Sequence, residues 1–209
     1  MSYRIKEIYF TQQGEGKNTG KNFVFVRFSG CNLWSGKEKN RESAICKFCD
    51  TDFYGVDGVN GGIYEAKELV RMIKSLWMVD SSPVSAVLTG GEPLLQLDDE
   101  LIQELKKEDI YIAIETNGTL LAPDGIDWIC MSPKAGTEIK LRSGSEIKVV
   151  YPQKDLDPDK FSDLDFKNFF IQPMDSKELE SNVAKSIKFC MDNPKWRLSL
   201  QTHKILGIR

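Results

Sequence analysis

Three cysteines near the start of the chain have a spacing suited to binding a metal centre. Cys31, Cys46 and Cys49 form the pattern C-x14-C-x2-C. The thiolates of Cys46 and Cys49 lie on one tight turn, where both can bind the same centre. A structural zinc site usually closes all four coordination positions with protein ligands, and a ferredoxin-type cluster also uses four. Three thiolates therefore favour an iron–sulfur cluster that leaves one iron open to an exogenous ligand.

Two other interpretations of these cysteines stay open at this point. A zinc site needs a fourth ligand, which His203, the only histidine, or Asp50 could supply. A redox-active Cys-x-x-Cys is less favoured, because no thioredoxin-like context surrounds it. The remaining cysteines, Cys130 and Cys190, lie among apolar residues. We expect both to pack in the core, since a free cysteine behaves as a small hydrophobe.

The composition is that of an ordinary globular protein. Of 209 residues, 41% are hydrophobic and 28% are charged, and the net charge is -3. This length predicts a single domain over residues 1–209. The negative charge argues against bulk nucleic-acid binding, which needs a basic face. No apolar run approaches the ~20 residues that span a bilayer, and the first residues lack a signal-peptide layout. We therefore expect a cytoplasmic protein whose cysteines form no disulfide framework.

Short apolar segments alternate with amphipathic ones, which predicts an α/β fold. The expected strands are Phe23–Phe28, Val84–Leu88, Ile110–Ile114, Trp128–Met131, Ile147–Val150, Phe169–Ile171 and Leu198–Leu200, with a further strand at Ile5 and Ile8–Phe10. The expected helices are Tyr64–Trp77, Asp98–Lys107 and Ser176–Met191. The connections 115–127 and 132–146 are too polar or glycine-rich for good helices. A complete eight-fold barrel uses about 250 residues, so we predict a partial (β/α) barrel that lacks several outer helices.

Polar motifs follow the carboxyl ends of the predicted strands. They are Ser29-Gly30-Cys31, Thr89-Gly90-Gly91-Glu92-Pro93, Glu115-Thr116-Asn117-Gly118, Ser132-Pro133-Lys134, Gln172-Pro173-Met174-Asp175 and Gln201-Thr202-His203. Sites in parallel α/β sheets assemble at that edge. Loops are polar in most proteins, but a polar motif after each of several strands favours a shared site.

The cysteine loop followed by Gly90-Gly91-Glu92-Pro93 resembles the radical S-adenosylmethionine (SAM) superfamily, whose usual cluster loop is C-x3-C-x2-C. The longer first gap resembles one subgroup of the 7-carboxy-7-deazaguanine synthase family of the queuosine pathway. The resemblance spans nearly the whole chain. It is carried by Gln13–Gly16, Arg27–Trp34, Cys49–Phe53, Thr89–Pro93, Glu115–Gly118, Ser132–Lys134, Gln172–Asp175 and Trp196–Lys204.

The resemblance implies a lyase with a truncated, modified radical SAM barrel. Its expected reaction converts 6-carboxy-5,6,7,8-tetrahydropterin to 7-carboxy-7-deazaguanine with loss of ammonia. The implied cofactors are a [4Fe–4S] cluster on Cys31, Cys46 and Cys49, SAM, and Mg²⁺ bound through Thr51. The implied partners are the small-molecule pterin, a second copy of the chain in a homodimer, and a flavodoxin- or ferredoxin-type electron donor.

The resemblance also assigns residues to the two ligands. The SAM positions are Phe48, Gly91, Glu92, Ser132, Pro133, Lys134, Gln172, Pro173, Met174 and Asp175. The substrate positions are Gln12, Gln13, Gly14, Glu15, Arg27, Thr89, His203 and Arg209. The planar fork of Arg27 suits a substrate carboxylate, and Glu92 could accept from the amino group of SAM. Glycines at 90 and 91 would let backbone approach the cofactor closely.

Two alternative functions belong to different classes of protein. A glycyl-radical-enzyme activase is similar in size, but it typically uses the C-x3-C-x2-C loop. Such activases also lack the combination of Arg27, Thr51 and Gln201-Thr202-His203. A small zinc-stabilised binding module is the non-enzyme alternative, and it leaves the strand-end motifs unexplained.

Overall fold

The computed structural model describes residues 2–209, and these form one mixed sheet of nine strands. The strand order is β3-β1-β2-β4-β5-β6-β7-β8-β9. The strands are β1 (Ser2–Gln12), β2 (Asn22–Phe28), β3 (Gly62–Glu65), β4 (Ser85–Gly90), β5 (Tyr111–Thr116), β6 (Trp128–Met131), β7 (Ser143–Tyr151), β8 (Asp165–Pro173) and β9 (Arg197–Leu198). β1 is antiparallel to β2 and β3, and the other neighbouring pairs are parallel. The predicted parallel α/β sheet is confirmed, and β3 is a strand that the sequence did not indicate.

Four α-helices lie in the described part of the chain. They are α1 (Ala66–Leu76), α2 (Asp99–Lys107), α3 (Leu179–Asp192) and α4 (Thr202–Leu206), with 3-10 turns at Gly16–Asn18, Glu38–Asn40, Pro93–Leu95 and Pro158–Phe161. A capping box of Glu65 and Glu68 begins α1, and the Asp98 side chain caps α2. The first three helices were predicted, whereas α4 was not. None of the helices in residues 2–209 is both long enough and apolar enough to cross a lipid bilayer.

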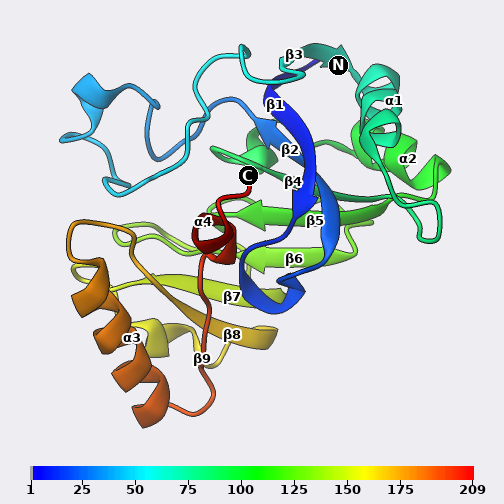
Figure 1. The fold of residues 1–209 in the computed structure, drawn as a ribbon. Coiled ribbons are helices and arrows are strands. Elements are labelled where there is room, and N and C mark those ends of the chain that lie inside the picture. Colours follow the sequence, from blue (N-terminus) through cyan, green and yellow to red (C-terminus); the bar gives the residue numbers. More distant parts are fainter. Residues whose placement is uncertain (1) are drawn as a thin grey trace.

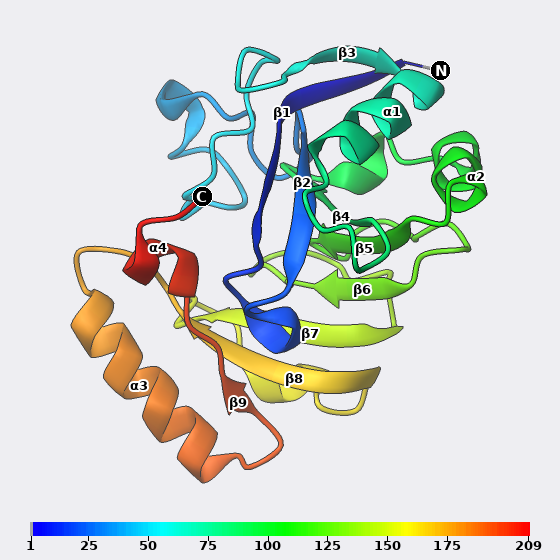
Figure 2. The same cartoon turned by 45° about the vertical axis from the view of Figure 1, so that its right-hand side comes forward.

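The three longer helices, α1, α2 and α3, lie toward the two ends of the sheet, whereas the short α4 lies beside the loop after β1, as Figures 1 and 2 show. α1 packs on β1, β2 and β3, α2 packs on α1 and β5, and α3 packs on β8 and β9. The described chain has no helix between β5 and β6 or between β6 and β7. The predicted lack of helices over 115–127 and 132–146 is therefore confirmed, and the sheet is an open, partial barrel.

Along the strands that contain apolar runs, successive side chains point to opposite faces of the sheet. On β2, Val24, Val26 and Phe28 pack in the main core with α1 and α2, while Phe25 packs in a smaller cluster on the opposite, concave face. The same period of two places Arg27 on that concave face. On β4, β5, β6, β7 and β8, the residues in phase with Arg27 are Thr89, Glu115, Cys130, Lys148 and Gln172. The concave face is therefore apolar at its base and polar near the carboxyl ends of the strands.

Candidate functional site

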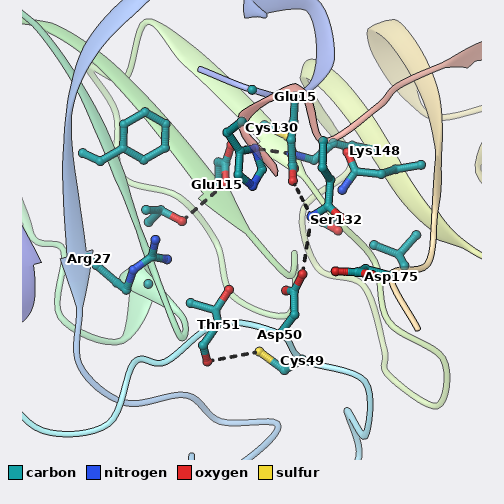
Figure 3. A pocket seen from close by; sticks show the side chains of 18 of the residues that line it. Glu15, Arg27, Cys49, Asp50, Thr51, Glu115, Cys130, Ser132, Lys148 and Asp175 are labelled. Carbon is teal, nitrogen blue, oxygen red and sulfur yellow. Dashed lines mark hydrogen bonds and ion pairs between the residues drawn. The ribbon is translucent and has the colours of Figure 1, made fainter. Parts of the chain in front are cut away.

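A cavity of about 580 Å³ opens on the concave face at the carboxyl ends of the strands. Its lining includes residues of the predicted strand-end motifs after β4, β5, β6, β8 and β9, together with residues of the cysteine loop. The predicted convergence of these motifs on one site is thus seen. We call Glu15, Arg27, Glu115 and Lys148 the charged end of the cavity. The cysteine end is Cys46, Phe48, Cys49 and Thr51. Figure 3 shows Cys49 and Thr51 across from Glu15, Glu115 and Lys148.

The charged end contains a lysine between two carboxylates. The Lys148 side chain is only 4% exposed, its Nζ forms an ion pair with Glu15 Oε2, and it lies 3.5 Å from Glu115 Oε1. Burial alone would lower the pKa of Lys148, but the charges of Glu115 and Glu15 raise it well above its usual value. Burial would likewise raise the pKa of Glu15, but Lys148 lowers it. Glu15 is therefore ionised at neutral pH.

Arg27 projects from β2 toward the cavity from one side (Figure 3). Its Nε donates to Glu7 Oε1 at 2.9 Å, and its Nη2 donates to the Tyr9 hydroxyl at 3.0 Å. These two contacts fix the guanidinium plane, and the side chain is 16% exposed. Arg209 also contacts this group, with Nη1 3.5 Å from Glu7 Oε2 and its guanidinium over the Tyr9 ring. The arrangement gives one held, partly desolvated cation that suits a carboxylate ligand.

The segment that carries α4 closes over the first loop of the chain. Thr202 donates its backbone N–H to the carbonyl of Gly14 at 2.9 Å. A Cβ atom at Gly14 would lie 2.2 Å from His203 Nδ1, so no larger residue fits there without displacing the histidine. Gln201 Nε2 donates to Glu15 Oε1 at 2.9 Å. His203 therefore lines the cavity because α4 is held against the loop after β1.

Lys204 joins the two walls of the cavity mouth. Its Nζ contacts Asp50 in the cysteine loop and lies 2.6 Å from Asp175 Oδ2 after β8. All three side chains are about two-fifths exposed. Burial opposes the charge on Lys204, but both carboxylates raise its pKa. This bridge is solvated, so its contribution to stability is small.

The cysteine loop is folded back on itself by one arginine. Arg41 Nη1 donates to the carbonyls of Lys47 and Cys49 at 2.9 and 3.1 Å. Its guanidinium lies 4.0 Å from the centre of the Trp34 ring, and this ring packs edge-on against Phe53. These contacts bring the long segment between the first and second cysteines back toward the turn that carries the second and third.

The three predicted cluster ligands are free thiols that lie near one another. Cys46 is 5% exposed, and Cys31 and Cys49 are half-buried. Burial raises the pKa of Cys31 and of Cys49, and a neighbouring Cys46 thiolate raises both further. Both thiols are therefore protonated at neutral pH until a metal centre displaces their protons.

The donor set fits a cluster better than a single ion. Within residues 2–209, no three histidine, cysteine, aspartate or glutamate side chains converge closely enough to hold one metal ion. A zinc site needs four donors around one ion, whereas a four-iron cluster binds each thiolate through a different iron. Lys134, held by 2.7 Å bonds to the Ser132 carbonyl and hydroxyl, adds a half-buried amine beside Cys46 and Cys49. Three thiols and a nearby amine suit an anionic iron–sulfur cluster.

The Gly90-Gly91-Glu92 segment joins neighbouring loops at the carboxyl ends of the strands. A Cβ atom at Gly91 would lie 2.1 Å from the Gly30 carbonyl oxygen, so the glycine allows two loops to touch. Glu92 is completely buried and does not line the cavity. Its carboxylate accepts from the Thr116 hydroxyl at 2.8 Å and from the Asn117 N–H at 2.7 Å. Glu92 thus ties the loop after β4 to the loop after β5, and its predicted contact with the amino group of SAM stays a prediction.

The other predicted residues are distributed as follows. Every predicted substrate position and Thr51 line the cavity, and so do Phe48, Gly91, Ser132, Lys134, Gln172, Pro173, Met174 and Asp175. Cys31 and Pro133 lie just outside the lining. Cys130 is buried as predicted, yet it reaches the cavity wall rather than an apolar core, beside Glu146. Residues not assigned to a ligand from the sequence also line it: Glu7, Tyr9, Glu115, Lys148, Gln201 and Lys204. The roles of all these residues stay predictions.

Comparison with known proteins gives a consistent result. The Radical SAM superfamily model matches residues 40–148. Proteins named 7-carboxy-7-deazaguanine synthase from Bradyrhizobium diazoefficiens, Caulobacter vibrioides and Bordetella pertussis are 55%, 50% and 48% identical to the chain, and each match covers 100% of both sequences. The crystal structure of QueE from Escherichia coli has a TM-score of 0.71 at 24% identity, covering 96% of this chain and 94% of that one. That structure supports the fold alone.

Proposed function

Because the chain belongs to the 7-carboxy-7-deazaguanine synthase family of radical SAM enzymes, we propose that it converts 6-carboxy-5,6,7,8-tetrahydropterin to 7-carboxy-7-deazaguanine with loss of ammonia. The observation that carries the proposal is one cavity with the thiols of Cys46 and Cys49 at one end and a buried charged network at the other. The product serves queuosine or another 7-deazapurine pathway. The [4Fe–4S] cluster and SAM, when bound, supply the reductive cleavage of SAM and the removal of a hydrogen atom from the substrate.

The protein's own residues bind and orient the two ligands. Cys31, Cys46 and Cys49 hold the cluster, and the segments around Ser132 and Gln172–Asp175 receive SAM next to it. Arg27 receives the substrate carboxylate, because its guanidinium is fixed in a partly dry wall. The backbone near Gln13 and the carboxylate of Glu15 receive the amide and amino edge of the pterin. This layout places the substrate carboxylate and ring between two fixed groups of opposite charge.

Magnesium is proposed to bind beside the cysteine end through Thr51. The acids that flank Thr51 are each engaged, Asp50 with Lys204 and Asp52 with Lys6 at 2.8 Å. The Thr51 hydroxyl is then the available protein oxygen, and Mg²⁺ would keep water and substrate oxygens in its shell. Replacing Thr51 by valine should raise the Mg²⁺ concentration for half-maximal activity about tenfold. An unchanged requirement would remove Thr51 from the metal site.

The proposal also covers the domain organisation, oligomeric state, location and electron donor of the enzyme. We expect one domain over residues 1–209, a homodimer, a cytoplasmic location, and a flavodoxin- or ferredoxin-type protein as the electron donor. The charged residues in the cavity lining and the partly exposed thiols of Cys31 and Cys49 suit a small-molecule enzyme that receives electrons from outside. Light scattering of the purified protein tests the dimer, and single turnovers with each reduced carrier test the donor.

The decisive test uses the reconstituted enzyme under anaerobic conditions. Reductant, SAM, Mg²⁺ and the carboxy-tetrahydropterin should yield an ultraviolet-absorbing deazapurine and one equivalent of ammonia. The matched control replaces all three cluster cysteines by alanine and should release neither. A colourless protein with one zinc and no sulfide would overturn the cluster. Reductive cleavage of SAM without deazapurine would leave the superfamily and remove the proposed reaction.

A further inference from the structure

Lys148 is a buried cation in an otherwise apolar stretch of β7. Its neighbours on the strand, Ile147 and Val149, are fully buried in the core cluster beneath α3. Lys148 points the opposite way, to the concave face, where it lines the cavity (Figure 3). A lysine that is 4% exposed persists only where carboxylates compensate its charge. Lys148 therefore belongs to the site rather than to the core.

The two carboxylates beside Lys148 come from elements far apart in the chain. Glu15 follows β1, and Glu115 is the penultimate residue of β5. Lys148 pairs with both, so its ammonium fixes the separation of the loop after β1 from the carboxyl end of β5. Gln201 donates to Glu15, and Gln13 Nε2 donates to Glu115 Oε1 at 2.9 Å. Lys148, Gln201 and Gln13 thus hold the two carboxylates, and none of the three is itself an acid.

A count of hydrogen-bond acceptors shows what the pair has left for a ligand. An ionised carboxylate offers about four acceptor positions. Gln201 and Lys148 occupy two of them on Glu15. On Glu115, Gln13 and Lys148 occupy two and the Thr89 hydroxyl, at 3.4 Å, a third. About three acceptor positions remain on two carboxylates that both line the cavity, which suits a ligand edge with adjacent N–H groups.

We propose that Lys148 is a positioning residue that holds the carboxylates of Glu15 and Glu115 in place, and keeps Glu15 ionised, as acceptors for the N–H edge of the substrate. The inference rests on the proposed function, because it takes the pterin as the ligand. Protonation would convert a carboxylate acceptor into a donor, which would face the N–H donors of the substrate. Lys148 prevents that protonation at Glu15, whose side chain is largely shielded from water.

Other charged and titratable groups face this cluster and do not replace the ammonium. They are Glu146 on the same strand, Cys130 on β6, Lys134 after β6 and His203 on α4. Burial raises the pKa of Glu146, which accepts from the Lys17 N–H at 2.9 Å. Lys134 is engaged with Ser132. Without Lys148, the acids would therefore lack a bound cation.

The test compares Lys148→Met with wild type and with Lys106→Met, which removes an exposed lysine paired with Asp127 on the surface. In Lys148→Met, burial of Glu15 is no longer opposed, so its pKa should rise. The apparent affinity for the carboxy-tetrahydropterin should then fall at least tenfold at pH 6.5 and recover by at least threefold at pH 8.5. Wild type and Lys106→Met should show neither change. Lys148→Arg, which keeps the charge, should restore part of the pH 6.5 affinity.

Two readouts keep this inference separate from the proposed function. Iron and sulfide content should be unchanged in Lys148→Met, because the cysteine end is intact. Equilibrium binding of the substrate to the cluster-loaded enzyme with SAM measures the charged end directly. If wild type neither binds nor converts the pterin, the proposed function fails. If wild type does both and Lys148→Met matches it at pH 6.5, or loses affinity equally at both pH values, the positioning role of Lys148 is overturned.

Discussion

The charged end of the cavity is built on strands, whereas the cysteine end is built on loops. Arg27, Glu115 and Lys148 each stand on a strand of the sheet. They are held by ion pairs that leave little of each side chain exposed. The cluster cysteines lie between β2 and β3, where the loop carries many exposed residues and is held mainly by Arg41. The ligand-recognition end is therefore preorganised by the fold, while the cysteine end gains its final order with its cluster.

The largest loss of activity is expected from a substitution at the cysteine end. Cys46→Ala removes one of three thiolates, and among residues 2–209 no neighbouring acid or histidine converges to replace it. Reductive SAM cleavage should fall by at least about a thousandfold, because the cluster is the source of the electron. Cys190→Ala is the control, since that half-buried thiol lies at the end of α3. Anaerobic iron analysis and 5′-deoxyadenosine quantification measure both. Retained cleavage in Cys46→Ala would contradict the ligand role.

A smaller, selective loss is expected at the charged end. Arg27→Ala removes a charge-assisted hydrogen-bond donor worth about 1.5–3 kcal/mol, so substrate affinity should weaken ~10- to 150-fold. The iron content should be unchanged, because the strand that carries Arg27 does not hold a cysteine. Arg71→Ala, on the surface of α1, is the matched control. Titration of the cluster-loaded enzyme with substrate gives the affinities. Equal affinities would take Arg27 out of the site.

Glu92 ties the loop after β4 to the loop after β5, so its replacement should lower the stability of the protein. Glu92→Gln puts an amide donor where the carboxylate accepts from Asn117 N–H and the Thr116 hydroxyl. The free energy of unfolding should fall by about 1–3 kcal/mol. Glu138→Gln, at an exposed position, should change it by less than ~0.5 kcal/mol. Urea unfolding followed by circular dichroism compares the two. A neutral Glu92→Gln would mean that the loops do not depend on this carboxylate.

The smallest effect is expected from the exposed Lys204 bridge at the mouth of the cavity. Lys204→Met removes the bridge between Asp50 and Asp175, which are both substantially exposed. Such solvated pairs contribute about 0–1 kcal/mol, so substrate affinity should change by less than about fivefold. Raising the salt concentration should reduce even that difference. A loss comparable with that of Arg27→Ala would show that α4 acts as a functional closure rather than a surface contact.

The sequence predicts the sheet well because most strands are buried on both faces and contain apolar runs. It does not indicate β3, a short, half-exposed strand that exists by pairing with β1. It also does not indicate α4, whose five residues are exposed or half-buried and lack a side-chain cap. α4 is held by contacts such as Thr202 to Gly14, which periodicity cannot show.

The site residues can be predicted from the sequence where the residue type itself indicates the chemistry. They are harder to predict where the burial of a side chain determines whether it faces the cavity. The cysteine spacing and the strand-end motifs point to residues that gather around the cavity. Glu92 stands in such a motif, yet its complete burial turns it inward. Lys148 carries a readable signal, since a charged residue interrupts an apolar strand in phase with Arg27, Thr89 and Glu115. Distinguishing such a residue from a surface lysine requires knowing that both faces of β7 are covered.

The contacts between α4 and the loop after β1 also determine when the site can form during folding. Gln201 and Glu15 are separated by 186 positions in the chain, and Thr202 and Gly14 by 188. A growing polypeptide can complete the hairpin of β1 and β2 early, whereas the wall made by His203 arrives only after nearly all of the chain has been synthesised. A nascent or C-terminally truncated chain should therefore hold much of the sheet while remaining unable to retain the pterin.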